Sequence, residues 1–119
     1  MKKSNVVLIG MPGAGKSTVG VVLAKILGYK FVDTDLVIQE KEGRLLKEII
    51  ADEGNDGFLE IEDRINAQLE AEDSVIAPGG SVVYGENAMR HFKDIATVVY
   101  LKASYETINE RLSNLEGRG

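Results

Sequence analysis

The feature that most constrains this chain is the glycine-rich stretch at residues 10–18, which reads GMPGAGKST. It fits the phosphate-loop pattern of a glycine, four variable residues and then Gly-Lys-Ser. The apolar run at residues 6–9 (VVLI) is typical of a buried strand, and apolar residues at helical spacing follow the loop. A strand, a glycine-rich turn and a helix in this order predict a nest of main-chain N–H groups for an anion.

Each part of this stretch has its own task. The glycines let the backbone turn tightly, and the helix that follows adds its unpaired N–H groups and the positive end of its dipole. Lys16 is placed to reach the β- and γ-phosphates of a nucleotide, and the Ser17 hydroxyl is placed to bind Mg²⁺. The alternative is a plain turn with a surface lysine, but strand, loop and helix agree on nucleotide binding. The residues expected to hold the nucleotide are Gly13, Ala14, Gly15, Lys16, Ser17 and Thr18.

Composition limits the classes of partner. The 119 residues suffice for one domain, residues 1–119, and 44% hydrophobic with 28% charged residues is an ordinary globular balance. A net charge of −5 without a basic block argues against nucleic acid and for a small ligand held by a few local cations. We find no signal peptide, no membrane span and no cysteine, and we expect a cytoplasmic protein with no membrane partner.

Short apolar runs alternate with helical stretches along the chain. This alternation predicts an α/β fold with a parallel sheet and right-handed crossovers. The expected strands are residues 5–9, 30–32, 74–77 and 97–101. Residues 34–73 make a helical excursion that is long for a plain crossover, with a break at 54–57, and its acidic residues, Glu62 among them, surround an apolar stripe. The excursion is either a substrate flap or a solvated cover over the sheet.

Polar and glycine residues follow the expected strands at the edge where ligands bind in parallel sheets. Asp33 and Asp35 come after the second strand, where they suit a Mg²⁺ contact and a hydroxyl acceptor; helix capping would explain one of these acids, not both. Gly79 and Gly80 follow the third strand, where a ligand can approach the backbone closely, although a bare turn is the alternative. His91 lies on the polar side of a helical pattern, and we expect it to be a solvated surface residue.

These motifs together resemble the shikimate kinase family of small P-loop metabolite kinases, along nearly the whole chain. The phosphate loop, Asp33-Thr34-Asp35 and Gly79-Gly80 fall at the family spacing, and Phe58 followed by Ile61-Glu62 resembles the start of its substrate-binding helix. The resemblance implies a three-layer, P-loop nucleoside-kinase-like α/β fold with strand order 2-3-1-4. It also implies ATP and Mg²⁺, with a small hydroxylated metabolite, shikimate first, as the acceptor that binds in the 34–73 excursion.

The resemblance also implies roles for individual residues. Lys16, Asp35 and Arg118 would be catalytic: Lys16 stabilises the transferring phosphoryl group, Asp35 accepts the substrate hydroxyl, and Arg118 closes over the phosphates. The further expected contacts are Mg²⁺ with Ser17 and Asp33, substrate with Asp35, Gly79 and Gly80, and nucleotide with Arg111 and Arg118.

Three departures from the family pattern stand out. Leu59 replaces an arginine that grips the substrate carboxylate, and Ser81 replaces a third glycine. The chain ends where the family's lid begins, without a fifth strand, so we expect a fragment of a longer kinase. A complete protein would be a monomer, whereas a truncated one would pair through the exposed edge of the fourth strand. Besides the metabolite kinase, a nucleotide-binding module without turnover and a nucleoside monophosphate kinase remain alternatives.

Overall fold

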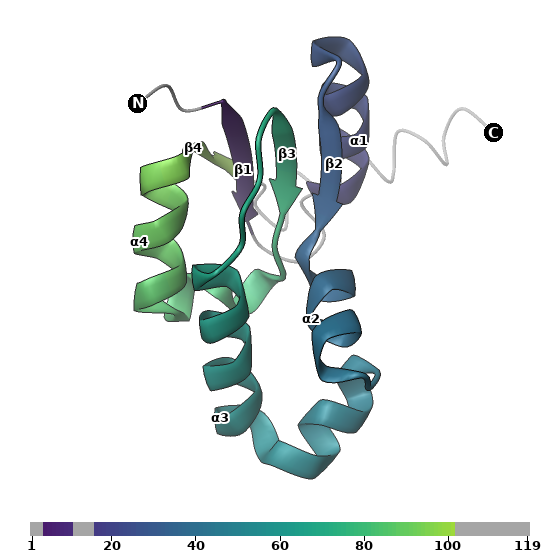
Figure 1. Cartoon of the computed structure of the whole chain (residues 1–119), viewed down its shortest axis with the longest axis vertical. Helices are drawn as coiled ribbons and strands as arrows, with labels where there is room; N and C mark the ends of the chain where they lie inside the picture. Colours follow the sequence, from purple (N-terminus) through teal and green to yellow (C-terminus); the bar gives the residue numbers. More distant parts are fainter. Residues whose placement is uncertain (1–3, 11–15, 102–119) are drawn as a thin grey trace, which may run out of the picture.

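A parallel sheet forms the centre of the molecule (Figure 1), and the computed structural model describes residues 4–10 and 16–101. The strand order is β2-β3-β1-β4, with Val7 of β1 beside Ile76 of β3 and Val98 of β4. The four strands are β1 (Asn5–Gly10), β2 (Lys30–Asp33), β3 (Ser74–Ala77) and β4 (Ala96–Leu101). The predicted α/β class and the strand order 2-3-1-4 are confirmed, and each strand lies within one residue of its expected bounds.

Helices cover both faces of this sheet, which gives the predicted three layers. Helix α1 (Lys16–Leu27) packs on one face, where Leu8 and Val75 form a buried cluster with Ala24. Helix α4 (Glu86–Ile95) packs on the other. Its cluster includes Val7, Ile9, Ile76, Val82 and Phe92. Neighbouring residues of a strand therefore belong to opposite cores, as the period of two along a strand requires.

The excursion between β2 and β3 has its own apolar centre and extends beyond the carboxyl end of the sheet (Figure 1). It consists of α2 (Thr34–Glu42) and α3 (Leu46–Ala67). The buried cluster that joins them is Ile38, Ile49, Ile61 and Ile65. Gly54 interrupts α3 with a φ of 76°, a left-handed conformation that favours glycine. The predicted break is thus a kink at its first residue, and residues 55–57 already belong to the next helical segment.

A glycine also ends helix α1. Gly28 follows α1 with a φ of 70°, as expected of a C-terminal cap. Among the described residues, β4 pairs on one side only, with β1, and Tyr100 is 55% exposed there. Pairing between copies through this edge stays a prediction.

Candidate active site

The phosphate-binding end of the site lies where β1 passes into α1. Lys16 is the first residue of α1, and its Nζ donates a hydrogen bond to the carbonyl of Gly10, 2.8 Å away. Burial raises the pKa of both Asp35 and Glu62, and the Lys16 ammonium opposes these shifts, so its positive charge acts across the edge of the sheet. Residues 11–15 lie outside the described part of the chain, and of Ser17 only the backbone, in the first turn of α1, is described.

The two acids after β2 make different contacts in the structure. Asp33 is the N-cap of α2, and its Oδ1 accepts a hydrogen bond from the Asp35 main-chain N–H at 2.9 Å. Asp35 lies in the first turn of the same helix and makes no such capping bond. Its pKa is raised, mainly by burial and further by the negative charge of Asp33, and Lys16 opposes this shift. Capping therefore accounts for one carboxylate and leaves Asp35 for another role.

The glycine after β3 lets the backbone approach two carboxylates. A Cβ placed on Gly79 would lie 2.9 Å from Asp35 Oδ1 and 3.2 Å from Glu62 Oε2. Gly79 has ordinary extended angles, φ −62° and ψ 160°, so it is space and not backbone strain that calls for glycine here. The next residue, Gly80, begins the short 3-10 helix η1 (Gly80–Tyr84). Asp35 and Glu62 therefore face the same small volume beside the Gly79 backbone.

Glu62 is absent from the site residues expected from the sequence, where it is only one of the acids beside the apolar stripe of the excursion. It is only 2% exposed, unlike most acids of the excursion. Its Oε1 accepts a hydrogen bond of 2.7 Å from the Ser81 hydroxyl. The serine that replaces the family's third glycine thus provides a partner for a buried carboxylate.

The negative charge of Asp35 acts on the buried carboxyl of Glu62. Burial raises the pKa of Glu62 most, and the negative charges of Asp35 and Asp63 raise it further. The Ser81 hydrogen bond and the charge of Lys16 lower it. A carboxylate whose pKa is raised by burial, as at Asp35 and Glu62, accepts a proton from a bound hydroxyl more readily than an exposed carboxylate does.

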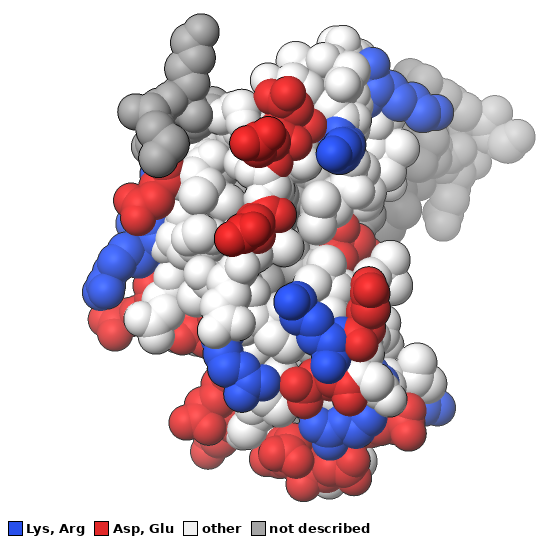
Figure 2. Space-filling view, in the orientation of Figure 1, with Lys and Arg blue, Asp and Glu red and all other residues white. Residues whose placement is uncertain are grey.

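Arg44 does not add a cation to this site. Its guanidinium contacts Glu42 at 2.8 Å and Asp52 at 3.0 Å, at the end of the excursion that lies farthest from the sheet, and Arg64 reaches the same Glu42 at 3.2 Å. Figure 2 shows acidic and basic side chains intermixed over this lower end of the molecule. Arg44 therefore ties the turn after α2 to the first half of α3, and Leu59 is not compensated from there.

His91 is more than a solvated surface residue, which corrects that expectation. Its ring is half-buried, and Nε2 lies 2.6 Å from the carbonyl oxygen of Leu69, to which it donates a hydrogen bond. It joins α4 to the segment after α3, away from the acidic pair, and supports the fold.

Several expected site residues lie outside the described part of the chain. They are Gly13, Ala14, Gly15, Arg111 and Arg118. Thr18, by contrast, is exposed in the first turn of α1. Within residues 4–10 and 16–101, no cluster of three or more metal-ligating side chains is present. Over the same ranges no helix has the length and apolar character needed to cross a membrane.

Comparison with known proteins agrees with this geometry. A family model described as shikimate kinase matches residues 12–119. A shikimate kinase of Sulfurihydrogenibium sp. is 41% identical over 96% of this chain and 69% of its own length. The crystal structure of a shikimate kinase from Acinetobacter baumannii in complex with shikimate is similar with a TM-score of 0.80 and 34% identity, over 96% of this chain and 64% of that one.

A gluconokinase from Sinorhizobium meliloti, 22% identical, has a TM-score of 0.60 over 97% of this chain and 66% of its own, and shares the fold. The chain spans about two thirds of the length of the relatives it matches. The architecture is thus that of the P-loop kinases. The family model matches most of the chain, and Lys16, Asp35 and Gly79 lie at one edge of the sheet. This chain therefore belongs to the shikimate kinase family.

Proposed function

We propose that the protein transfers the γ-phosphoryl group of ATP to a hydroxyl of a small acceptor, with shikimate the first acceptor to test. The observation that carries this proposal is the placement of Asp35 beside the Gly79 backbone, within the field of Lys16. Family membership and the shikimate complex of the A. baumannii relative support the choice of acceptor.

Phosphoryl transfer needs positioning and charge neutralisation more than a protein nucleophile. The Lys16 ammonium would exchange its bond to the Gly10 carbonyl for phosphate oxygens and offset the charge that develops during transfer. Asp35 would orient the acceptor hydroxyl and take its proton. Its raised pKa favours this, because a base works best when its pKa approaches the working pH.

Ser17 and Asp33 would hold Mg²⁺, which supplies positive charge at the β- and γ-phosphate oxygens when it is bound. The donor set fits this metal, because Mg²⁺ commonly takes one or two protein oxygens and completes its shell with phosphates and water. The hydrogen bond from the Asp35 N–H fixes the Asp33 carboxylate at the carboxyl end of β2, the edge of the sheet at which the phosphates would bind.

The remaining contacts follow the family pattern. Gly80 would offer its backbone to the acceptor, and Arg118 would close over the phosphates while Arg111 lies on the adenine side. The main-chain N–H groups of the phosphate loop would hold the nucleotide. The loop residues proposed for this are Gly13, Ala14, Gly15 and Thr18.

The test is acceptor-dependent ADP release, measured with shikimate, other hydroxy acids, sugars and amino acids. We expect turnover with one acceptor, a loss of about 100-fold or more in Lys16→Met, and near-normal turnover in Lys93→Met, which removes an exposed lysine from α4. Binding of ATP without turnover on any acceptor would favour a nucleotide-binding module, and phosphorylation of a nucleoside monophosphate would favour the related nucleotide kinases.

One observation favours a second class of acceptor, a polyol without a carboxylate. Leu59 cannot make the charge-assisted contact that an arginine makes with a substrate carboxylate. Arg44 is engaged by Glu42 and Asp52, and Glu62 brings a further acid to the acceptor side. A sugar or polyol that outperforms shikimate in the same panel would establish this alternative.

A further inference from the structure

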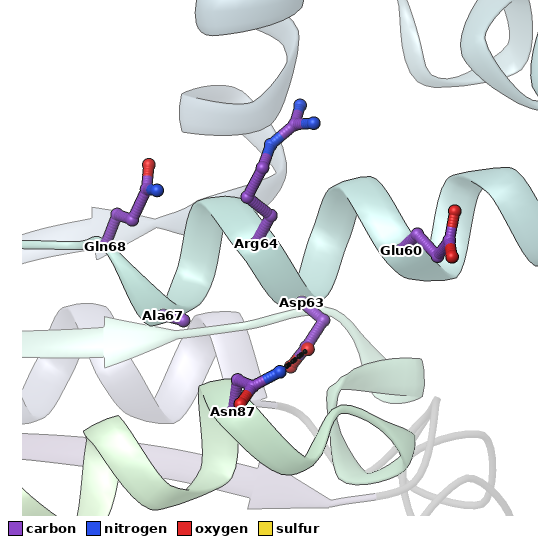
Figure 3. Close-up of a pocket in the computed structure, with 6 residues that line it drawn as sticks. All are labelled: Glu60, Asp63, Arg64, Ala67, Gln68 and Asn87. Atoms are coloured by element: carbon purple, nitrogen blue, oxygen red, sulfur yellow. Dashed lines mark hydrogen bonds between the residues drawn. The ribbon is translucent and has the colours of Figure 1, made fainter.

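Two consecutive acids of α3 hold the two ends of the segment that connects β3 to α4. Glu62 accepts a hydrogen bond from the Ser81 hydroxyl at the start of this segment, 2.7 Å away. Asp63 accepts two hydrogen bonds beyond its end, from the main-chain N–H of Ala88 at 2.7 Å and from Asn87 Nδ2 at 2.9 Å. Figure 3 shows the Asp63 carboxylate directed away from α3 and toward Asn87.

Asp63 performs the task of an N-cap for a helix to which it does not belong. The N-cap position of α4 is Gly85, which has no side chain, and no side chain of its own residues caps this helix. Ala88 is three residues further on, and its N–H is one that a local Asp or Ser at the N-cap would bind. A Cβ on Gly85 would overlap Asp63 Oδ1. The glycine therefore makes room for a carboxylate that comes from α3.

This arrangement couples the end of α4 to the acceptor side of the site. Val82, in the middle of the connecting segment, is 1% exposed and packs in the same core as Phe92 of α4. At the other end of the segment, Gly79 lies beside the Asp35 and Glu62 carboxylates. A movement of α4 relative to α3 would thus change the spacing between Gly79 and these two carboxylates.

We propose that Asp63 is a positioning residue for the acceptor site: it joins the first turn of α4 to α3 and so holds the Gly79–Gly85 segment at a fixed distance from Glu62 and Asp35. This inference rests on the proposed function. A capping role alone needs no residue from α3, because a serine at position 85 would cap α4 locally. The cap instead comes from Asp63, and its neighbour Glu62 lies on the acceptor side of the site.

The test separates capping from positioning with two variants and a control. Asp63→Ala removes both the cap and the tie between the helices. Adding Gly85→Ser to it supplies a local cap and restores only the first. The angles φ −93° and ψ 103° at position 85 suit a serine, and without the carboxylate the nearest contact of the serine Cβ is the Cβ of residue 63, 3.1 Å away, which must give by a few tenths of an ångström. Glu60→Ala is the control, since Glu60 is exposed one turn earlier on α3 and makes no hydrogen bond to the other described residues.

We expect Asp63→Ala to lower the melting temperature and to raise the acceptor KM about tenfold, the scale of one charge-assisted hydrogen bond, with the KM for ATP unchanged. The double variant should regain the melting temperature and keep the raised acceptor KM. Recovery of both would show that Asp63 only stabilises α4, and an unchanged acceptor KM in Asp63→Ala would also overturn the proposal.

Hydrogen exchange keeps this inference separate from the proposed function, because it needs no turnover. In the double variant, the Ala88 amide should regain its protection while the Val82 amide, which donates to the Gly79 carbonyl, exchanges faster than in the wild type. Wild-type exchange at Val82 in that variant would contradict the coupling, whatever the acceptor proves to be. Failure of the wild type to turn over any acceptor would instead reject the proposed function.

Discussion

Gly79→Ala tests the acceptor site with the smallest possible change. The substitution adds one methyl group, whose carbon would lie 2.9 Å from Asp35 Oδ1 and 3.2 Å from Glu62 Oε2. Ordinary contact for such a carbon begins at 3.4 Å, so the Asp35 oxygen must retreat by about 0.5 Å, the difference between 3.4 and 2.9 Å. The backbone angles at Gly79 are open to alanine, and the chain itself need not move.

The expected result is a loss of activity with little change in stability. Misplacement of a catalytic group by 1 Å can cost about 100-fold, so a shift of half that size should lower kcat about tenfold. Alanine at a compatible position leaves the unfolded chain fewer conformations than glycine does, which stabilises the folded protein by about 0.4–1 kcal/mol. This gain offsets part of the cost of the contact with the carboxylates. The melting temperature should therefore change by only a few degrees.

The assay is acceptor-dependent ADP release, with kcat and both KM values measured in a double-mutant cycle. If the methyl group acts by displacing Asp35, then Gly79→Ala should cost little further activity in an Asp35→Asn background, where the base is already lost. Additive losses in the two variants, or wild-type kcat in Gly79→Ala, would refute the placement of Asp35 beside this glycine in the working enzyme.

Three further predictions follow from the charges around the site. Arg44→Ala should lower the melting temperature by at most a few degrees and leave the acceptor KM unchanged, because its partners lie at the far end of the excursion; a raised acceptor KM would contradict this. Burial raises the pKa of Glu62 above its ordinary 4.5, so the folded state binds this proton more tightly than the unfolded chain does, and stability falls as pH rises from 4.5 through the folded-state pKa. Glu62→Gln keeps an acceptor for Ser81 and removes the charge, so denaturation should show it to be more stable than the wild type at pH 8, with the difference shrinking toward pH 4; a constant difference would count against burial as the cause. Asp33→Asn should retain the capping hydrogen bond from the Asp35 N–H, and with it the melting temperature, but raise the Mg²⁺ concentration needed for half-maximal ADP release. EDTA should stop the reaction in both the variant and the wild type. An unchanged Mg²⁺ requirement would show that Asp33 does not contact the metal.

The sheet could be predicted from the sequence because its signals are local. Strands buried on both faces read as short runs of β-branched residues between helical stretches, and residues 74–77 were expected with the bounds that β3 has. Gly28 and Gly54 mark a helix end and a kink because each adopts a positive φ. That capping explains only one of the two acids after β2 followed from geometry, because one side chain serves one helix start; Asp33 is the acid that caps.

The contacts of α3 could not be predicted in the same way, because they join residues far apart in the chain. Helical spacing places Glu62 beside the apolar stripe, and only its pairing with Ser81, 19 residues away, explains why it is buried. Asp63 reaches Ala88 across 25 residues. The only local signal is that Gly85 offers α4 no capping side chain, and it does not identify Asp63.

The most direct test is a crystal structure of the protein with shikimate, Mg²⁺ and a non-hydrolysable ATP analogue. We predict a shikimate hydroxyl within hydrogen-bonding distance of the Asp35 carboxylate, beside the Gly79 backbone, with Lys16 Nζ on the phosphates and no longer on the Gly10 carbonyl. Shikimate bound away from Asp35, or Lys16 still bonded to Gly10 with the nucleotide in place, would contradict it.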